Sequence, residues 1–483
     1  MDTLSKDELK RRGFISTISL FFQSGYSAVL GLVANLVVTI LLSPHIFGIY
    51  ITVLSVIALL NYFSDFGLAA SLIQKKEMTD DDVRTTFTVQ QSLIITLISI
   101  GFVITPFVKK FYDLPQEGIY LYWALLFSFF VSSLKTIPSV FLERHIQFNK
   151  VVYVQVVENT LFYTAVSTLA ILHFSLMSFT YAVLIRAVVG LIMIYKISPW
   201  SPRIGIHKQS LKTLLSFGVP FQATSFLALF KDDLITLFLG KILGFELLGY
   251  VGWAKKWADA PLRVFMDNVG RVLFPVMARV QDDKEKLRSI SHKLLYYQTM
   301  LLAPVLVGMM FALPMLVQLI PQYGKWEPAI PLFYIFALSS LIVSFSAPFM
   351  ALFNALGKVK ITFSFMLLIT TITWILTPIM TARFHQYGFP LTHIIVSTTL
   401  GFILLKVKST LHMKILPAIY RPLLASAGMG IVLFGFHTLV PTVDIFGFIF
   451  TALLGAVTYF GLMTYVFRTN ILHELLELKR THV

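Results

Sequence analysis

The stretch "LSPHIFGIYITVLSVIALLNYFSDFGLAASLIQKKEMTDDDVRTTF" (42–87) decides the fold of this chain. Residues 46–73 form an apolar run that contains one carboxylate, Asp65, and the run ends in a block of mixed charge. A helix needs about 20 predominantly apolar residues to cross a bilayer, whereas the strands of a membrane barrel are shorter and alternate strictly. The stretch therefore predicts a membrane-spanning helix followed by a short charged loop.

The whole chain shares the composition of this stretch. Of its 483 residues, 57% are hydrophobic and 13% are charged, whereas soluble domains are about 45–50% apolar and about 25% charged. About fourteen apolar segments with short connections occupy residues 14–467. We therefore expect an all-α polytopic membrane protein with about 14 transmembrane helices.

Part of the stretch recurs in the second half of the chain. "LLSPHIFGIY" (41–50) resembles "LGKILGFELLGY" (239–250), and each is followed by a long apolar segment and a mixed-charge loop. The offset corresponds to six spans, which predicts two six-helix lobes related as parallel repeats, with a trailing helix pair. The predicted parts are a cytoplasmic N-terminus, an N-lobe, a C-lobe, the trailing pair and a cytoplasmic C-terminus, at 1–13, 14–208, 209–414, 415–467 and 468–483.

The net charge of +15 follows the predicted topology. If the N-terminus is inside, most Lys and Arg residues fall in loops on the same side, as the positive-inside rule requires. We therefore expect both termini in the cytoplasm and no nucleic-acid partner.

Charged residues inside apolar spans are costly and usually face a bundle interior or a wet cavity. Most of them fall in the spans 211–240 and 246–275, which we expect to form a hairpin that turns near residue 244. Asp233 then lies level with Lys255, and Asp232 lies level with Lys256. The cluster is either an ion-pair network that fixes helix packing or a partly cationic wall of a substrate cavity. Its members are Lys231, Asp232, Asp233, Lys255, Lys256, Asp259, Arg263 and Asp267.

Four further charges lie inside other spans. Arg186 is either an anion ligand in a transport pathway or the ion-pair partner of Glu158 on the preceding span. Lys135 lies near the inner end of its span, where we expect it to snorkel to the interface. Asp65 is followed by Gly67, as Asp267 is followed by Gly270, so the acid is either an ion-coupling site or a scaffold residue in both repeats.

Several classes of enzyme lack their motifs in this sequence. No GxxxxGK[ST], HExxH or GxSxG pattern occurs, and the chain has no cysteine, so a thiol nucleophile and a cysteine zinc site are excluded. The predicted external loops are short. We therefore expect a protein that is not an enzyme and that uses no cofactor.

The opening stretch resembles the first helices of polysaccharide-transport proteins in the multidrug/oligosaccharidyl-lipid/polysaccharide exporter superfamily. The resemblance continues in the same order through "FLERHIQFNKV", "ISPWSPRIGIHKQSLKTLLSFGVPFQ", "LGYVGWAKKWADAPLRVFMDNVGRVLFPVMARVQDDKEKLR" and "YGKWEPAIPLFYIFALSSLIVSFSAPFMALFNALGKVK", and covers residues 14–410. It is greatest to exporters of colanic and teichuronic acid units and to O-antigen flippases.

The resemblance implies two six-helix lobes around a central cavity, with alternating access in the bacterial cytoplasmic (inner) membrane. The implied cargo is an undecaprenyl-diphosphate-linked oligosaccharide for O-antigen, capsule or exopolysaccharide assembly. The implied partners are membrane lipid, this polyprenyl-linked cargo, and a polysaccharide polymerase and glycosyltransferases as candidates. The resemblance carries over no motif of functional residues, so the candidate site rests on span position and charge pairing.

The candidate site has a cationic part and an acidic part. The predicted ligands of the diphosphate or of acidic sugars are Arg186, Lys231, Lys255, Lys256 and Arg263. The predicted groups for coupling to H⁺ or Na⁺, or for holding those cations, are Asp65, Glu158, Asp232, Asp233 and Asp259.

Three other functions fit the same sequence less well. A multidrug or small-molecule exporter on the same fold would favour an acidic, aromatic pocket. A lipid-linked sugar polymerase or ligase would need a larger external loop. A non-transporting component of a glycan assembly complex would need no cavity.

Overall fold

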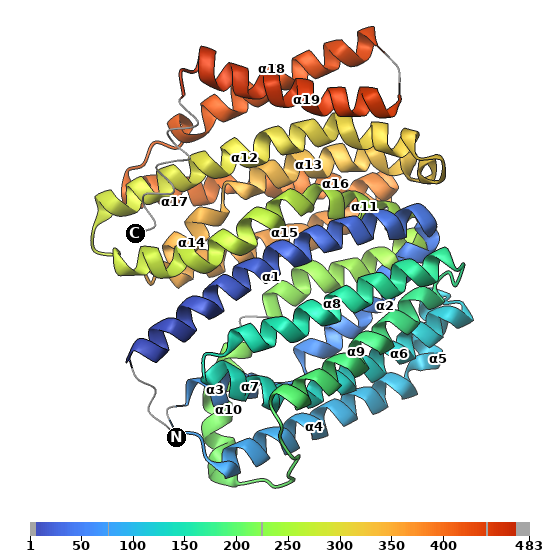
Figure 1. Ribbon diagram of the computed structural model, residues 1–483, viewed down its shortest axis with the longest axis vertical. Helices are drawn as coiled ribbons and strands as arrows, with labels where there is room; N and C mark the ends of the chain where they lie inside the picture. Colours follow the sequence, from blue (N-terminus) through green and yellow to red (C-terminus); the bar gives the residue numbers. More distant parts are fainter. Residues whose placement is uncertain (1–5, 76, 224–225, 441–442, 470–483) are drawn as a thin grey trace. The chain divides into compact units, whose positions relative to one another are not determined.

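The computed structural model describes residues 6–75, 77–223, 226–440 and 443–469. All regular structure in these residues is helical, which confirms the all-α expectation (Figure 1). The chain divides into two compact units, Met1–Gly249 and Tyr250–Val483. The predicted lobe borders near 208 and 414 stay a prediction.

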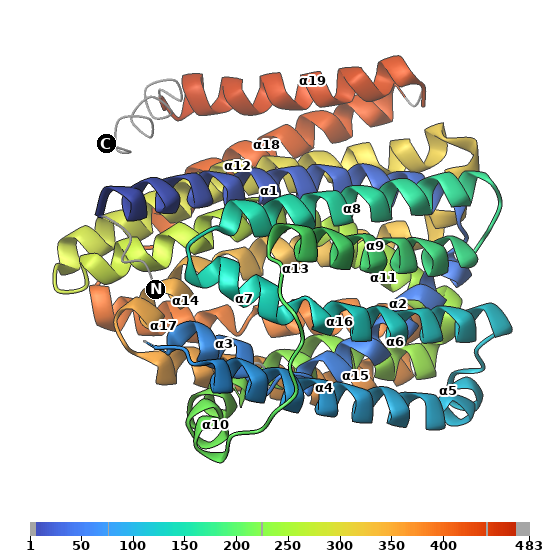
Figure 2. The same ribbon diagram turned by 60° about the horizontal axis from the view of Figure 1, so that its bottom comes forward.

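The first unit consists of long helices interrupted by short ones. Its elements are α1 (Lys6–Leu41), α2 (Pro44–Tyr62), α3 (Leu68–Gln74), α4 (Asp80–Val103), α5 (Thr105–Tyr112), α6 (Gln116–Leu134), α7 (Thr136–Arg144), α8 (Phe148–Ile171), α9 (Met177–Ile197), α10 (Lys208–Ala223) and the first part of α11 (Phe226–Arg279). Helix α8 packs against both α1 and α9, and α9 also packs against α6 (Figure 1, Figure 2).

The second unit contains the rest of α11 and the elements that follow it. These are α12 (Lys284–Leu319), η1 (Pro321–Ala329), α13 (Ile330–Ser344), α14 (Ala347–Ala355), α15 (Val359–Phe384), η2 (His385–Tyr387), α16 (Gly388–Ser397), α17 (Leu400–Leu411), α18 (Leu416–Leu439), α19 (Ile445–Gly461) and η3 (Leu462–Val466). Helix α12 packs against α13 and α18, and α16 packs against α13 and α15.

Eleven helical segments of the described residues are long and apolar enough to cross a membrane. Two of them, Leu229–Phe265 and Val359–Leu411, contain 37 and 53 residues, although about 20 suffice for one crossing. Helix α8 is not among the eleven, and it carries Gln155, Glu158 and Asn159 in its middle. The polytopic fold is confirmed, and the count of fourteen stays a prediction.

Several predicted spans are broken by local backbone geometry. The apolar run 46–73 is not one helix, because Phe66 and Gly67 have positive φ (43° and 73°) between α2 and α3. Asp65 lies in this break, and its carboxylate accepts a hydrogen bond from the amide of Ala69 at 3.2 Å. The side chain therefore satisfies an amide of the first turn of α3, which fits the scaffold alternative.

Gly244 also has a positive φ, with φ 74° and ψ 173°, and it interrupts α11 where the sequence predicts a turn. Asp232 and Asp233 belong to the first unit, whereas Lys255 and Lys256 belong to the second. Their mirrored pairing stays a prediction. Asp267 lies in α11, but its side chain is outside the described part of the structure.

The two repeated motifs of the sequence cross each other in the first unit. A Cβ atom at Gly48 would overlap the carbonyl oxygen of Phe245, and a Cβ atom at Gly249 would overlap that of Pro44. Only glycine permits this backbone approach. Gly48 and Gly249 are 201 positions apart, as are Pro44 and Phe245. The two contacts are therefore reciprocal, as an internal repeat would make them.

Candidate functional site

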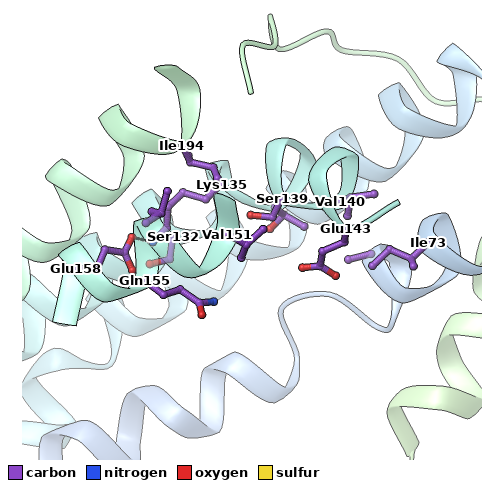
Figure 3. A pocket seen from close by; sticks show the side chains of 13 residues that line it. Ile73, Ser132, Lys135, Ser139, Val140, Glu143, Val151, Gln155, Glu158 and Ile194 are labelled. Atoms are coloured by element: carbon purple, nitrogen blue, oxygen red, sulfur yellow. Dashed lines mark hydrogen bonds and ion pairs between the residues drawn. The ribbon is translucent and has the colours of Figure 1, made fainter. Parts of the chain in front are cut away.

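A polar pocket of about 310 Å³ lies in the first unit where α3, α6, α7, α8 and α9 meet (Figure 3). Its charged residues are Lys135, Glu143 and Glu158. The other lining residues are Ala69, Ile73, Ser132, Thr136, Ser139, Val140, Val151, Val154, Gln155 and Ile194. A polar pocket formed by helices with a membrane-type composition is the main candidate site, because such groups are costly in lipid.

Lys135 enters the pocket because the helix breaks at this residue. Helix α6 ends at Leu134 and α7 begins at Thr136, so Lys135 is the link between them. Pro138, two residues into α7, has no amide hydrogen and cannot continue the hydrogen-bond ladder of α6. The break allows the lysine side chain to point towards α8.

Lys135 and Glu158 form a largely buried ion pair. The Lys135 Nζ donates to Glu158 Oε1 at 2.6 Å, and the two side chains are 18% and 6% exposed. The expectation that Lys135 snorkels to the interface is therefore wrong. Snorkelling keeps the ammonium in water, but here a buried carboxylate compensates its loss of hydration.

Arg186 on α9 is the second cation beside Glu158. Its Nε lies 4.0 Å from Glu158 Oε2, and its side chain is 45% exposed. The guanidinium also lies over the ring of Phe162, at 5.7 Å from the centroid. Lys135 makes the close contact with Glu158, so Arg186 keeps donors for another partner. The anion-ligand alternative stays a prediction. These three residues, Lys135, Glu158 and Arg186, are called the triad below, and they carry two positive charges and one negative.

Gly190 leaves open the space that the Glu158 carboxylate occupies. A Cβ atom at Gly190 on α9 would overlap Glu158 Oε1, so any larger residue would displace the carboxylate. Helices α8 and α9 therefore approach closely where the acid is buried. Close approach at a small residue is a common device in membrane helix packing.

A second acid–lysine pair lies in the second unit. Lys255 Nζ donates to Asp259 Oδ2 at 2.7 Å, one helical turn away on α11. The hydroxyl of Ser340 on α13 donates to Asp259 Oδ1 at 2.8 Å. His393 on α16 interacts electrostatically with Asp259 and packs edge-on against Phe389. Three groups from three helices, Lys255, Ser340 and His393, thus surround this carboxylate.

The other predicted site residues are not brought into the triad or the pocket. The Nζ atom of Lys231 lies 3.5 Å from Oδ2 of the neighbouring Asp232, and both side chains are partly exposed. Asp233, in the same turn of α11, is half-buried, and Lys256 and Arg263 lie exposed on the later part of α11. The assignment of these residues to cargo or ion binding stays a prediction.

Two pocket residues, Glu143 and Gln155, were not predicted from the sequence. Glu143 lies near the end of an apolar run and Gln155 carries no charge, so neither had the cost of burial that identified the other candidates. The signal that was available is Pro138, because a proline near the end of a span predicts a break that turns nearby side chains inward.

Comparison with known proteins places the chain in a family. The model of a family described as "Polysaccharide biosynthesis protein" matches residues 37–331. The lipopolysaccharide biosynthesis protein WzxC of Escherichia coli (strain K12) is 27% identical, over 79% of this chain and 76% of the relative. The teichuronic acid biosynthesis protein TuaB of Bacillus subtilis (strain 168) is 21% identical, over 77% and 78%.

Two solved structures share the fold. The lipid II flippase MurJ in an inward closed conformation superposes with a TM-score of 0.72 at 14% identity, over 95% of this chain and 98% of MurJ. An inward-facing multidrug resistance MATE family transporter of the MOP superfamily superposes with a TM-score of 0.57 at 15% identity, over 82% and 95%. The resemblance inferred from the sequence is confirmed: this chain belongs to the polysaccharide biosynthesis protein family, with the fold of MOP-superfamily transporters.

Proposed function

We propose that the protein is a flippase that moves a polyprenyl-diphosphate-linked oligosaccharide across the bacterial cytoplasmic membrane for polysaccharide assembly. The observation that carries this proposal is the family match over residues 37–331 on a chain with the fold of MurJ. The polar pocket and the triad supply groups that can bind a charged, hydroxylated headgroup inside a membrane protein.

The triad suggests how the chain handles the anionic part of such a cargo. Lys135 compensates Glu158, which leaves the half-exposed Arg186 as the surplus positive charge. A guanidinium presents several donors in a planar fork that suits phosphate oxygens. Arg186 is therefore our candidate ligand of the diphosphate, and alternating access would carry the bound headgroup between the two leaflets.

Orientation, partners and coupling belong to the same proposal. Most Lys and Arg residues lie in the loops that the positive-inside rule assigns to the cytoplasm, which supports cytoplasmic termini. Glu158 and Asp259 are the best-placed acids for coupling to H⁺ or Na⁺, because both are largely buried and paired with lysine. A polymerase and glycosyltransferases would act after and before the flippase.

A deletion strain tests the proposed function. We expect lipid-linked oligosaccharide to accumulate and surface or secreted polysaccharide to fall, and the wild-type gene to restore both. Arg186→Ala is expected to restore less than a tenth of wild-type polysaccharide at matched protein level, whereas Arg383→Ala, an exposed arginine on α15, should restore it fully. Lys256→Ala is expected to behave like Arg186→Ala.

One outcome would contradict the proposed function, and another would contradict only the assignment of its site residues. Unchanged lipid-linked oligosaccharide in the deletion strain, with greater sensitivity to cationic drugs, would indicate a multidrug exporter instead. Full restoration by both Arg186→Ala and Lys256→Ala would remove these residues from the cargo site while leaving the flippase function intact.

A further inference from the structure

We propose that the pocket between α7 and α8 binds the sugar part of the cargo, and that Glu143 accepts hydrogen bonds from sugar hydroxyls there. This inference rests on the proposed function, but it concerns which part of the headgroup the pocket takes.

The one cation that lines the pocket is engaged. Lys135 donates to Glu158 at 2.6 Å, and the other oxygen of that carboxylate faces Arg186 at 4.0 Å. A diphosphate would have to take Lys135 away from a buried acid, which would then lose its compensating charge. The lining of the pocket is therefore poorly suited to a phosphate group.

Glu143 is the charged group of the pocket that has no ion pair among the described residues. Its side chain is half-buried, and Figure 3 shows its carboxylate on the side of the pocket that holds Ser139. The neighbouring Arg144 does not compensate it. Arg144 Nη1 instead donates to the carbonyl oxygens of Leu72 and Lys75, both at 2.6 Å, at the end of α3.

Hydrogen-bond donors also line the pocket. The hydroxyls of Ser132 and Ser139 line it, one before and one after the break at Lys135. The side-chain oxygen of Gln155 on α8 accepts from Gln23, so its amide nitrogen is the group left to donate. Thr136 differs, because its hydroxyl already accepts from Gln90 at 3.1 Å.

These free groups match a sugar better than they match an anion. Each sugar hydroxyl both donates and accepts, so it can donate to Glu143 and accept from a serine or from Gln155. Val151, Val154 and Ile194 supply apolar surface for the C–H face of a ring. The pocket volume of about 310 Å³ lies at the lower end of the range for ligand sites, whose volumes are about 300–1,000 Å³. A phosphate would meet an uncompensated carboxylate in the same space.

The test compares two lipids on the purified full-length protein in detergent. One is polyprenyl diphosphate, and the other is polyprenyl diphosphate carrying the oligosaccharide isolated from the deletion strain. We expect wild type to bind the sugar-bearing lipid more tightly. Glu143→Gln should lower the affinity for the sugar-bearing lipid about tenfold, because a hydrogen bond to a charged group is lost. It should leave the affinity for polyprenyl diphosphate unchanged. Glu117→Gln, at an exposed position in the first turn of α6, is the matched control.

Each alternative result has a definite meaning. Equal weakening of both lipids, or of neither, by Glu143→Gln overturns the assignment of the pocket to sugar. Ser139→Ala removes a donor and changes no charge, so it should also lower the affinity for the sugar-bearing lipid selectively, but by less. If neither Ser139→Ala nor Glu143→Gln shows this selective loss, the pocket does not bind sugar. Wild-type protein that binds both lipids equally overturns this inference alone. Wild-type protein that is folded but binds neither overturns the proposed function as well.

Discussion

Glu158 and Asp259 are two largely buried carboxylates, one in each unit, and each accepts a hydrogen bond from a lysine at nearly the same distance, 2.6 and 2.7 Å. They differ in their second oxygen. That of Asp259 accepts from the neutral hydroxyl of Ser340 at 2.8 Å. That of Glu158 faces a second cation, Arg186, at 4.0 Å.

The difference shows how one kind of acid–lysine pair can serve two purposes. Lys255 and Asp259 are one turn apart on the same helix, and Ser340 completes a balanced set that ties α13 to α11. The partners of Glu158 come instead from a helix break and from α9, and they leave a surplus positive charge beside a pocket. The first arrangement is balanced in charge, whereas the second leaves Arg186 as the group that we propose binds an anion.

Lys135→Ala should have the largest effect on stability. It leaves Glu158 buried with only the more distant Arg186, and removal of one partner of a buried pair costs about 3–5 kcal/mol. The free energy of unfolding of the purified protein measures this. Lys255→Ala should cost less, because Asp259 is more exposed and keeps Ser340.

A double substitution distinguishes charge from packing at this position. Lys135→Met with Glu158→Gln removes both charges and should recover most of the lost stability. Equal losses for Lys135→Ala and Lys255→Ala would mean that the two carboxylates are equivalent after all.

Gly190→Ala should have an intermediate effect. The new methyl group would overlap the Glu158 carboxylate and force α8 and α9 apart or the acid out of place, at about 1–3 kcal/mol. Thermal unfolding compares it with Gly435→Ala on α18, where a Cβ meets open space and alanine should be neutral or stabilising. If Gly190→Ala unfolds at the wild-type temperature, Glu158 does not depend on this glycine.

Ser340→Ala should have the smallest effect of the three. It removes one hydrogen bond to a carboxylate that keeps its lysine, so we expect a loss of about 1 kcal/mol. Denaturant unfolding can resolve this against Ser409→Ala, an exposed serine on α17 whose hydroxyl bonds within its own helix. A loss as large as that of Lys135→Ala would make Ser340 the main support of Asp259.

The sequence predicted the helical membrane fold because apolar runs of about 20 residues have few alternatives in a bilayer. It also located the interruption at Gly244 and identified Glu158 and Arg186 as candidates. It did not locate the break at Phe66 and Gly67, because an apolar run looks the same whether its backbone is helical or not. The pairing of Lys135 with Glu158 depends on the break between α6 and α7 and on how α8 packs there. Pro138 signals the break, but the local sequence does not encode the packing of α8.

Gly48 crosses the backbone at Phe245, and Gly249 crosses the backbone at Pro44. Each contact joins a glycine of one motif to a carbonyl oxygen of the other motif, so each motif offers the same two positions to its partner. Such a contact is called isologous, and two identical subunits make it across a two-fold axis. This chain makes such a contact with itself. An alanine at either glycine therefore meets the same kind of obstacle, a carbonyl oxygen of the opposite motif. The two positions should tolerate substitution equally poorly, although they lie in different halves of the sequence.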